Sequence, residues 1–96
     1  MAVPRLTRFR VDPADANEML ARRNALVAAV RDTFSGLVEA RLGKVDDETW
    51  VDMWRWQSLA DAEAALANAA ALPQAAAAFA LARDITAENA EVVDER

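Results

Sequence analysis

All three tryptophans of this 96-residue chain lie within residues 50–57, and this stretch limits the possible fold more than any other. They stand at positions 50, 54 and 56, so each is an even number of residues from the others. Alternate side chains of an extended strand share a face, which predicts that the three indoles project together with Asp52. Such a face must be covered by helices, by a ligand or by a second copy of the protein.

Periodic patterns of apolar residues predict four strands and two helical segments. Alternating polar and β-branched or aromatic residues indicate strands, whereas apolar residues at spacings of three, four and seven indicate a helix. The expected strands cover residues 3–11, 37–45, 50–57 and 85–93, and the expected helical segments cover residues 13–34 and 60–82.

Local signals mark where the helices begin and bend. Asp12 suits the cap position before a helix, and Pro13 suits its first turn. Ser58, followed three residues later by Asp61, resembles a capping box that opens the second helical segment. Pro73 lacks a backbone donor and clashes with the preceding turn, so two helices are expected to meet at a bend near residues 72–73.

The polar residues 46–48 predict a turn between the second and third strands. A hairpin loop of two or four residues would pair Val45 with Trp50 and place Arg41 opposite Trp54. A loop of three or five residues would break this pairing. We expect residues 46–48 to be a solvated turn rather than a metal site, since they lack the repeat of a calcium loop.

The order strand, helix, strand, strand, helix, strand is that of the ferredoxin-like fold. This α+β fold has a four-stranded antiparallel sheet with helices on one side. A chain of this length is expected to form a single domain over residues 1–96. Both faces of the central hairpin carry apolar side chains, so we expect a homodimer in which two sheet faces meet.

Composition excludes several classes of partner and chemistry. The formal net charge of −5 argues against nucleic acid and against an anionic membrane surface. No apolar stretch reaches the roughly 18 residues that a membrane-spanning helix needs, and no signal sequence is apparent, so a cytoplasmic location is expected. The chain has no cysteine and no histidine, and we expect neither a metal site nor a cofactor.

Three arginines in the first strand, Arg5, Arg8 and Arg10, leave a phosphate-rich ligand open. A solvated strand face is the simpler interpretation of this basic strip.

Several short segments together give the chain a resemblance to a known family. They are residues 9–13, 35–38 and 56–58, the alanine-rich helix from residue 61, and residues 73–79. In their order and spacing these segments resemble the antibiotic biosynthesis monooxygenase family of dimeric α+β barrels. The likeness covers nearly the whole chain, and it implies the same fold and a dimer.

The resemblance also implies an activity and a site. Family members with known activity oxidise polycyclic aromatic or quinol-like substrates without metal or flavin. Their site lies between sheet and helices and includes an asparagine and, four residues later, a tryptophan on the third strand. These positions are occupied here by Asp52 and Trp56, so a carboxylate replaces the amide. The tyrosine that such enzymes use, and the histidine that haem-degrading members use, are absent, so haem is not expected.

Two charged residues break their local patterns. Asp52 lies on the indole-bearing strand face, and Arg23 lies within the apolar stripe of the first helix. One interpretation is a structural ion pair, or an arginine whose stem packs while its head reaches water. The other is a polar end to a ligand pocket, where Asp52 accepts the proton of a phenolic hydroxyl and Arg23 stabilises the anion.

The functional hypothesis is a cofactor-independent monooxygenase acting on a small aromatic or quinol-type metabolite. The alternative is a non-catalytic small-molecule-binding or structural homodimer, in which the indoles simply fill the space between sheet and helices and Arg41 stacks on Trp54. The candidate catalytic residues are Trp56, Asp52 and Arg23, and the candidate ligand-binding residues are Trp54, Phe79 and Arg41.

Overall fold

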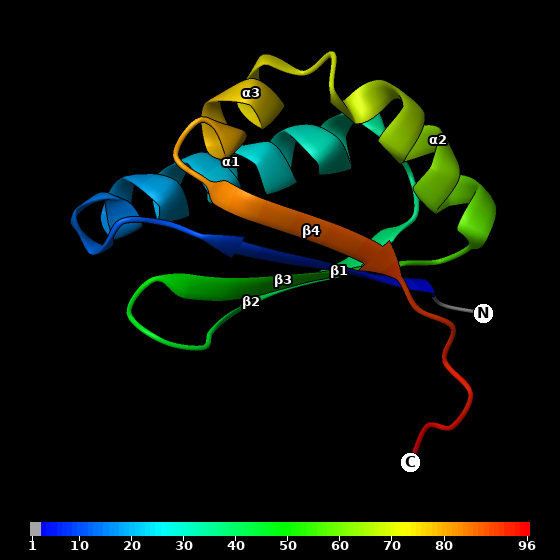
Figure 1. The fold of residues 1–96 in the computed structure, drawn as a ribbon. Coiled ribbons are helices and arrows are strands. Elements are labelled where there is room, and N and C mark those ends of the chain that lie inside the picture. The colour runs from blue at the N-terminus through cyan, green and yellow to red at the C-terminus, as the bar shows by residue number, and fades with distance from the viewer. Residues whose placement is uncertain (1–2) are drawn as a thin grey trace.

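The strands of the computed structural model, which describes residues 3–96, form one antiparallel sheet in the order β2-β3-β1-β4. All three α-helices lie on one face of this sheet (Figure 1). The predicted ferredoxin-like α+β fold is therefore confirmed. The strands are β1 (Val3–Arg10), β2 (Leu37–Lys44), β3 (Thr49–Trp56) and β4 (Arg83–Asn89), and the helices are α1 (Ala16–Thr33), α2 (Leu59–Ala69) and α3 (Pro73–Phe79), with a short 3-10 turn, η1 (Pro13–Asp15), before α1.

The helix signals in the sequence act as expected. The Asp12 carboxylate accepts a hydrogen bond from the Ala14 backbone N–H at 3.0 Å, and the Ser58 hydroxyl accepts one from the Asp61 N–H at 3.1 Å. Pro73 occupies the first turn of α3, so the alanine-rich segment is divided into two helices as predicted. Each capping oxygen satisfies a donor that has no partner within its own helix.

The last strand is shorter than the sequence pattern indicates. It was expected at residues 85–93, but β4 covers Arg83–Asn89 and residues 90–96 have no regular structure. The Ala90 N–H donates to the Pro4 carbonyl at 2.9 Å, close to the end of β1 at Val3. A strand needs a neighbour for its backbone groups, and the apolar residues after Ala90 have no strand beside them.

The expected hairpin register is wrong by one residue. Lys44 pairs with Trp50, so five residues, 45–49, separate these two paired positions. The Asp46 carboxylate stabilises this longer loop by accepting from the backbone N–H groups of Glu48 and Thr49, at 2.9 and 2.8 Å. Because side chains alternate along a strand, this shift reverses the face to which residues 39–44 of β2 were assigned relative to β3.

The observed register places Arg41 in a different position from the predicted one. This residue pairs with Met53 rather than with Trp54, and it projects from the face of the sheet opposite to the helices. Its guanidinium forms an ion pair with Glu39 instead of stacking on an indole.

The core between sheet and helices consists of two groups of buried side chains. Trp56 packs with Leu26 and Val30 of α1 and with the small alanines of α2 and α3. Phe9 and Trp50 pack with Met19 and Val11 at the other end. Trp50 is only 8% exposed, because it packs against Met19 of α1.

One glycine permits a close approach between β2 and α2. Gly36 has a φ of +96°, and a Cβ at this position would lie 2.4 Å from the Asp61 carboxylate. A residue with a side chain would therefore meet both an unfavourable backbone conformation and a clash. This contact places α2 over the end of β3 that carries Trp56.

Candidate functional site

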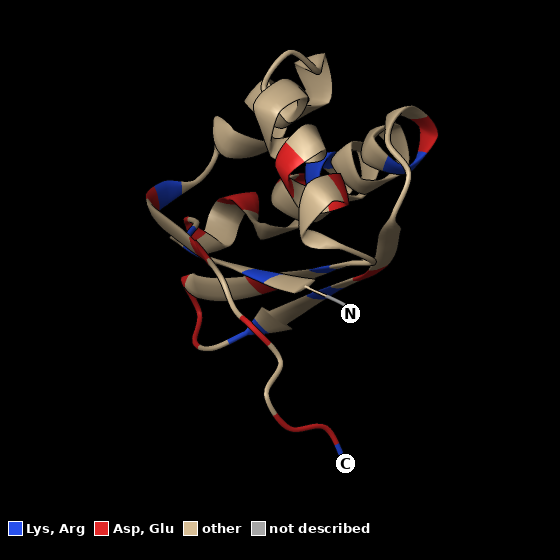
Figure 2. Ribbon diagram, turned by 90° about the vertical axis from the view of Figure 1, so that its right-hand side faces the viewer, with Lys and Arg blue, Asp and Glu red and all other residues tan. Residues whose placement is uncertain are grey.

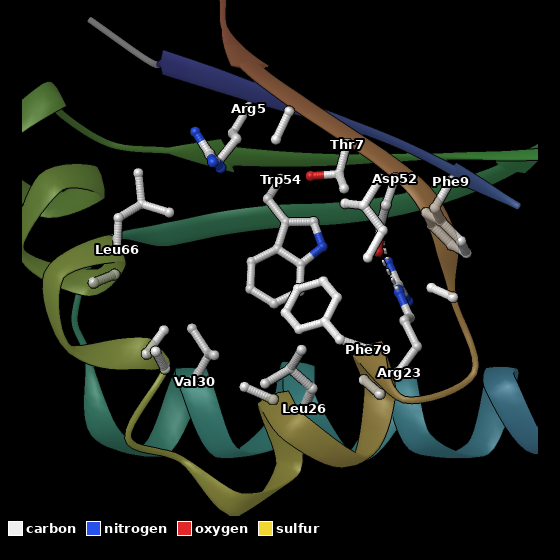
Figure 3. Close-up of a pocket in the computed structure, with 18 of the residues that line it drawn as sticks. Arg5, Thr7, Phe9, Arg23, Leu26, Val30, Asp52, Trp54, Leu66 and Phe79 are labelled. Carbon is white, nitrogen blue, oxygen red and sulfur yellow. Dashed lines mark hydrogen bonds and ion pairs between the residues drawn. The ribbon is translucent and has the colours of Figure 1, made fainter.

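A cavity of about 460 Å³ lies between the sheet and the helices (Figure 3). Its volume falls within the usual range for small-molecule sites. Its walls come from β1, β3 and β4 of the sheet and from all three α-helices. The lining residues are Arg5, Thr7, Phe9, Met19, Arg23, Leu26, Val30, Asp52, Trp54, Trp56, Ala65, Leu66, Ala69, Ala70, Ala75, Ala76, Ala78, Phe79, Ala82, Ile85 and Ala87.

The sheet wall of the cavity follows from strand alternation in β1 and β3. Arg5 is directly opposite Trp54, and Thr7 is directly opposite Asp52. Paired residues of an antiparallel sheet project to the same face, so these four side chains form one patch beneath the helices. Trp56 lies one row further along this face.

A bidentate ion pair forms the polar end of the cavity. Arg23 Nε donates to Asp52 Oδ2 at 3.1 Å, and Arg23 Nη2 donates to Oδ1 at 2.9 Å. The two side chains are 14% and 9% exposed. The parallel arrangement of two charge-assisted hydrogen bonds fixes both groups in orientation. Each carboxylate oxygen keeps a second lone pair that can accept from a ligand.

Aromatic side chains form the apolar part of the cavity. The rings of Trp54 and Trp56 are tilted by 44°, with their centroids 6.5 Å apart. Trp56 is 2% exposed and belongs mainly to the core, whereas Trp54 is half-buried and projects into the cavity next to Phe79 (Figure 3). Flat rings in such a position can stack on an aromatic ligand.

Exposed apolar side chains mark the mouth of the cavity. Leu66 of α2, Phe79 of α3 and Ile85 of β4 all line it, and they are 40%, 49% and 42% exposed. The mouth therefore lies between β4 on one side and α2 and α3 on the other. These elements are on the side of the molecule that faces the viewer in Figure 1. The opposite wall is the buried face of α1.

The structure brings together five of the six residues singled out in the sequence. Trp56, Asp52, Arg23, Trp54 and Phe79 all line the cavity. The sixth, Arg41, is not at the cavity, because the hairpin register places it on the far face of the sheet.

Sequence reasoning missed Arg5 and Thr7. Arg5 was grouped with Arg8 and Arg10 in one basic strip, although it stands an odd number of residues from Arg8. Strict alternation along the strand would have separated it from the other two and placed it beside Thr7.

Within residues 3–96, the structure brings together no group of three or more acidic side chains that could hold a metal ion. None of the helices in this part of the chain is long and apolar enough to cross a membrane.

Similarity to known proteins is found among solved structures. No protein-family model matches the chain, and no curated protein matches it. Among solved structures, it is similar to SnoaB, a cofactor-independent oxygenase from Streptomyces nogalater, with 26% identity and a TM-score of 0.75 over 98% of this chain and 95% of SnoaB.

Two further solved structures share the fold. Rv0793 from Mycobacterium tuberculosis is 21% identical with a TM-score of 0.69, covering 99% of this chain and 98% of the other. A provisionally named antibiotic biosynthesis monooxygenase from Caulobacter crescentus is 20% identical with a TM-score of 0.72, covering 97% and 91%. The resemblance to the antibiotic biosynthesis monooxygenases that the sequence indicates is thus confirmed in the fold.

Proposed function

We propose that this structural relative of the antibiotic biosynthesis monooxygenases is itself a monooxygenase, which oxidises a small aromatic or quinol-type metabolite without a cofactor. The observation that carries the proposal is the Arg23–Asp52 pair at the end of a cavity lined by indoles. The similarity to SnoaB, named a cofactor-independent oxygenase, supports the reaction class.

The cavity suits a flat substrate with one hydroxyl. The ring stacks on Trp54 between the sheet and Phe79, and the alanines of α2 and α3 leave room for it. The hydroxyl donates to Asp52, whose oxygens have free lone pairs beside the bonds to Arg23. Enclosure by apolar walls removes water and strengthens the electrostatic contacts at this polar end.

The Arg23–Asp52 pair offers a physical replacement for the family's asparagine. An amide both donates and accepts hydrogen bonds, whereas an ionised carboxylate only accepts. In this chain Asp52 supplies the acceptor and Arg23 supplies the donors, held together by two hydrogen bonds. The pair can therefore accept from a hydroxyl and stabilise the oxygen anion that follows.

The proposed substrate is a ring ketone, such as an anthrone, whose phenol tautomer forms when its ring CH₂ group loses a proton. The reaction oxidises this CH₂ carbon to a carbonyl. The phenolic proton passes to Asp52, and the phenolate gives one electron to O₂ to form a substrate radical and superoxide. Their recombination makes a carbon–oxygen bond, and Asp52 returns its proton to the peroxide. Loss of the remaining carbon-bound proton, with cleavage of the O–O bond, releases water and leaves one oxygen atom in the product.

We further propose that the protein acts as a homodimer through the outer face of its sheet. Leu6, Val51 and Met53 lie half-buried on this face, and no helix in residues 3–96 covers them (Figure 1). Basic and acidic residues occur on neighbouring strands of the sheet (Figure 2). A two-fold interface can place opposite charges together around an apolar centre.

Oxygen uptake with a panel of anthrones and hydroquinones tests the activity. We expect uptake above buffer for the wild type and a loss of at least about tenfold in kcat/KM for Trp56→Phe and Asp52→Asn. Trp50→Phe and Asp32→Asn are matched controls, since neither residue lines the cavity. Ligand binding without uptake above buffer for any compound would overturn the monooxygenase and leave the non-catalytic binding dimer.

A further inference from the structure

Arg5 lies in the cavity wall in a position that the proposed reaction does not use. Its side chain projects from β1 toward the helices, beside Trp54 and on the same face as Thr7 (Figure 3). The residue is half-buried. Its one side-chain hydrogen bond in the described part of the chain goes from Nη1 to the neutral amide oxygen of Asn89, at 3.1 Å.

Arg5 differs from the other arginines in its charge environment. Every other half-buried arginine of residues 3–96 forms an ion pair: Arg22 with Glu18, Arg23 with Asp52, and Arg55 with Glu95. Arg8 and Arg31, which also have no acidic partner in this part of the chain, are exposed to solvent.

The absence of a carboxylate beside Arg5 is informative in an acidic chain. The sequence carries 16 acidic residues against 11 basic ones, yet none forms an ion pair with Arg5 in the described structure. A half-buried cation without a partner is unfavourable, and its guanidinium retains several donors in a fork that fits a carboxylate.

The cavity as a whole carries one excess positive charge. Its ionisable lining residues are Arg5, Arg23 and Asp52, and the last two compensate each other. A neutral ligand would leave the charge of Arg5 without a counterion, whereas a monoanionic ligand would balance it.

The pairing of the strands fixes how far Arg5 lies from Asp52, at the polar end of the cavity. Arg5 is directly opposite Trp54, and Asp52 is directly opposite Thr7. Arg5 and Asp52 therefore lie in adjacent rows on one face of the sheet. Rows on one face are about 6.8 Å apart along a strand. An aromatic compound stacked on Trp54 therefore meets Asp52 with one edge and Arg5 with another.

We propose that Arg5 is the anion-binding residue of the cavity, and that the natural ligand is an aromatic compound with a carboxylate group. The carboxylate accepts hydrogen bonds from Arg5 while a hydroxyl on the far edge of the ligand donates to Asp52. This inference rests on the proposed function, because it names the class of substrate for the same site.

Isothermal titration calorimetry with a matched pair of probes tests this assignment. The probes are a hydroxynaphthoate, with hydroxyl and carboxylate on opposite rings, and the corresponding hydroxynaphthamide. We expect the wild type to bind the carboxylate at least about tenfold more tightly than the amide, the scale of one charge-assisted hydrogen bond. Binding is measured without O₂, so the result does not depend on whether the protein is an oxygenase.

Two variants and a control complete the experiment. Arg5→Gln is expected to bring the carboxylate-to-amide ratio of affinities close to one, while Arg5→Lys keeps part of the preference. Arg31→Gln removes the same charge from an exposed site and should leave the ratio unchanged. Equal binding of both probes to the wild type, or an unchanged preference in Arg5→Gln, would overturn the role of Arg5 but leave the oxygenase proposal standing. Failure of the carboxylate probe to bind the wild type would overturn the role of Arg5 as well.

Discussion

Arg23 and Asp52, 29 positions apart in the chain, form the two-pronged hydrogen-bonded pair that closes one end of the cavity. Arg23 comes from the helical layer and Asp52 from a middle strand of the sheet. The pair therefore joins the two layers at the cavity.

Loss of one partner from this pair should strongly destabilise the protein. We expect Arg23→Met to lower the free energy of unfolding by about 3–5 kcal/mol, because the buried Asp52 charge then has no counterion. The double variant Arg23→Met/Asp52→Leu should recover much of this loss. Arg41→Met is the control, since the Arg41 side chain is 76% exposed and its pair with Glu39 contributes about 1 kcal/mol or less. Urea denaturation measures all three, and equal losses at Arg23 and Arg41 would contradict the structural role.

The two glycines should respond oppositely to alanine. Gly36→Ala is expected to cost about 1–3 kcal/mol, since it combines a positive φ with a contact of 2.4 Å to Asp61. Gly43→Ala should be neutral or stabilising by up to about 1 kcal/mol, because its Cβ would be 3.8 Å from the nearest atom, the Val51 carbonyl oxygen. Chemical denaturation of the two variants makes the comparison. Similar effects at both positions would mean that the approach of α2 to β2 is looser than described.

The hairpin loop should make stability depend on pH in the acid range. The backbone N–H of Glu48, together with hydrogen bonds from Thr49, holds the pKa of the Asp46 carboxyl below its ordinary value of 3.8. A carboxyl whose pKa is lower in the folded state stabilises the protein above its unfolded-state pKa, and this contribution is lost as pH falls through the folded-state value.

NMR titration of the Asp46 carboxyl is therefore expected to show a midpoint below 3.8. Asp46→Asn should reduce the loss of stability on acidification below that pH, whereas Ser58→Ala, which removes a cap without a titrating group, should keep the wild-type pH dependence. A midpoint at the ordinary value would show that these hydrogen bonds are not formed in solution.

The outer face of the sheet should determine assembly. Met53→Glu places a charge at the centre of this face, and we expect it to convert a dimer into a monomer. Leu59→Glu changes an exposed apolar residue on α2 and should leave the dimer intact. Sedimentation velocity distinguishes the two states. A monomeric wild type at micromolar concentration would show that this face does not join two copies.

Much of the architecture follows from local rules that can be applied to the chain alone. The even spacing of the tryptophans identified β3 as a strand. Capping side chains marked where helices begin, and Pro73 marked where the alanine-rich segment divides. These signals can be recognised because each acts within a few residues. The break in pattern at Asp52 and Arg23 also pointed to their pairing. The ends of β4 were misjudged because a strand extends only as far as its neighbour supplies backbone partners.

The sequence by itself determined the types and order of the elements, and it indicated that the indole face needs cover. Only the tertiary structure decided the register of the β2–β3 hairpin, and with it the exclusion of Arg41 from the cavity. It likewise decided that Arg5, and not Arg8, lines the cavity. The physical reason is that faces and registers depend on a loop geometry and on contacts between distant residues, where a shift of one position reverses every side chain.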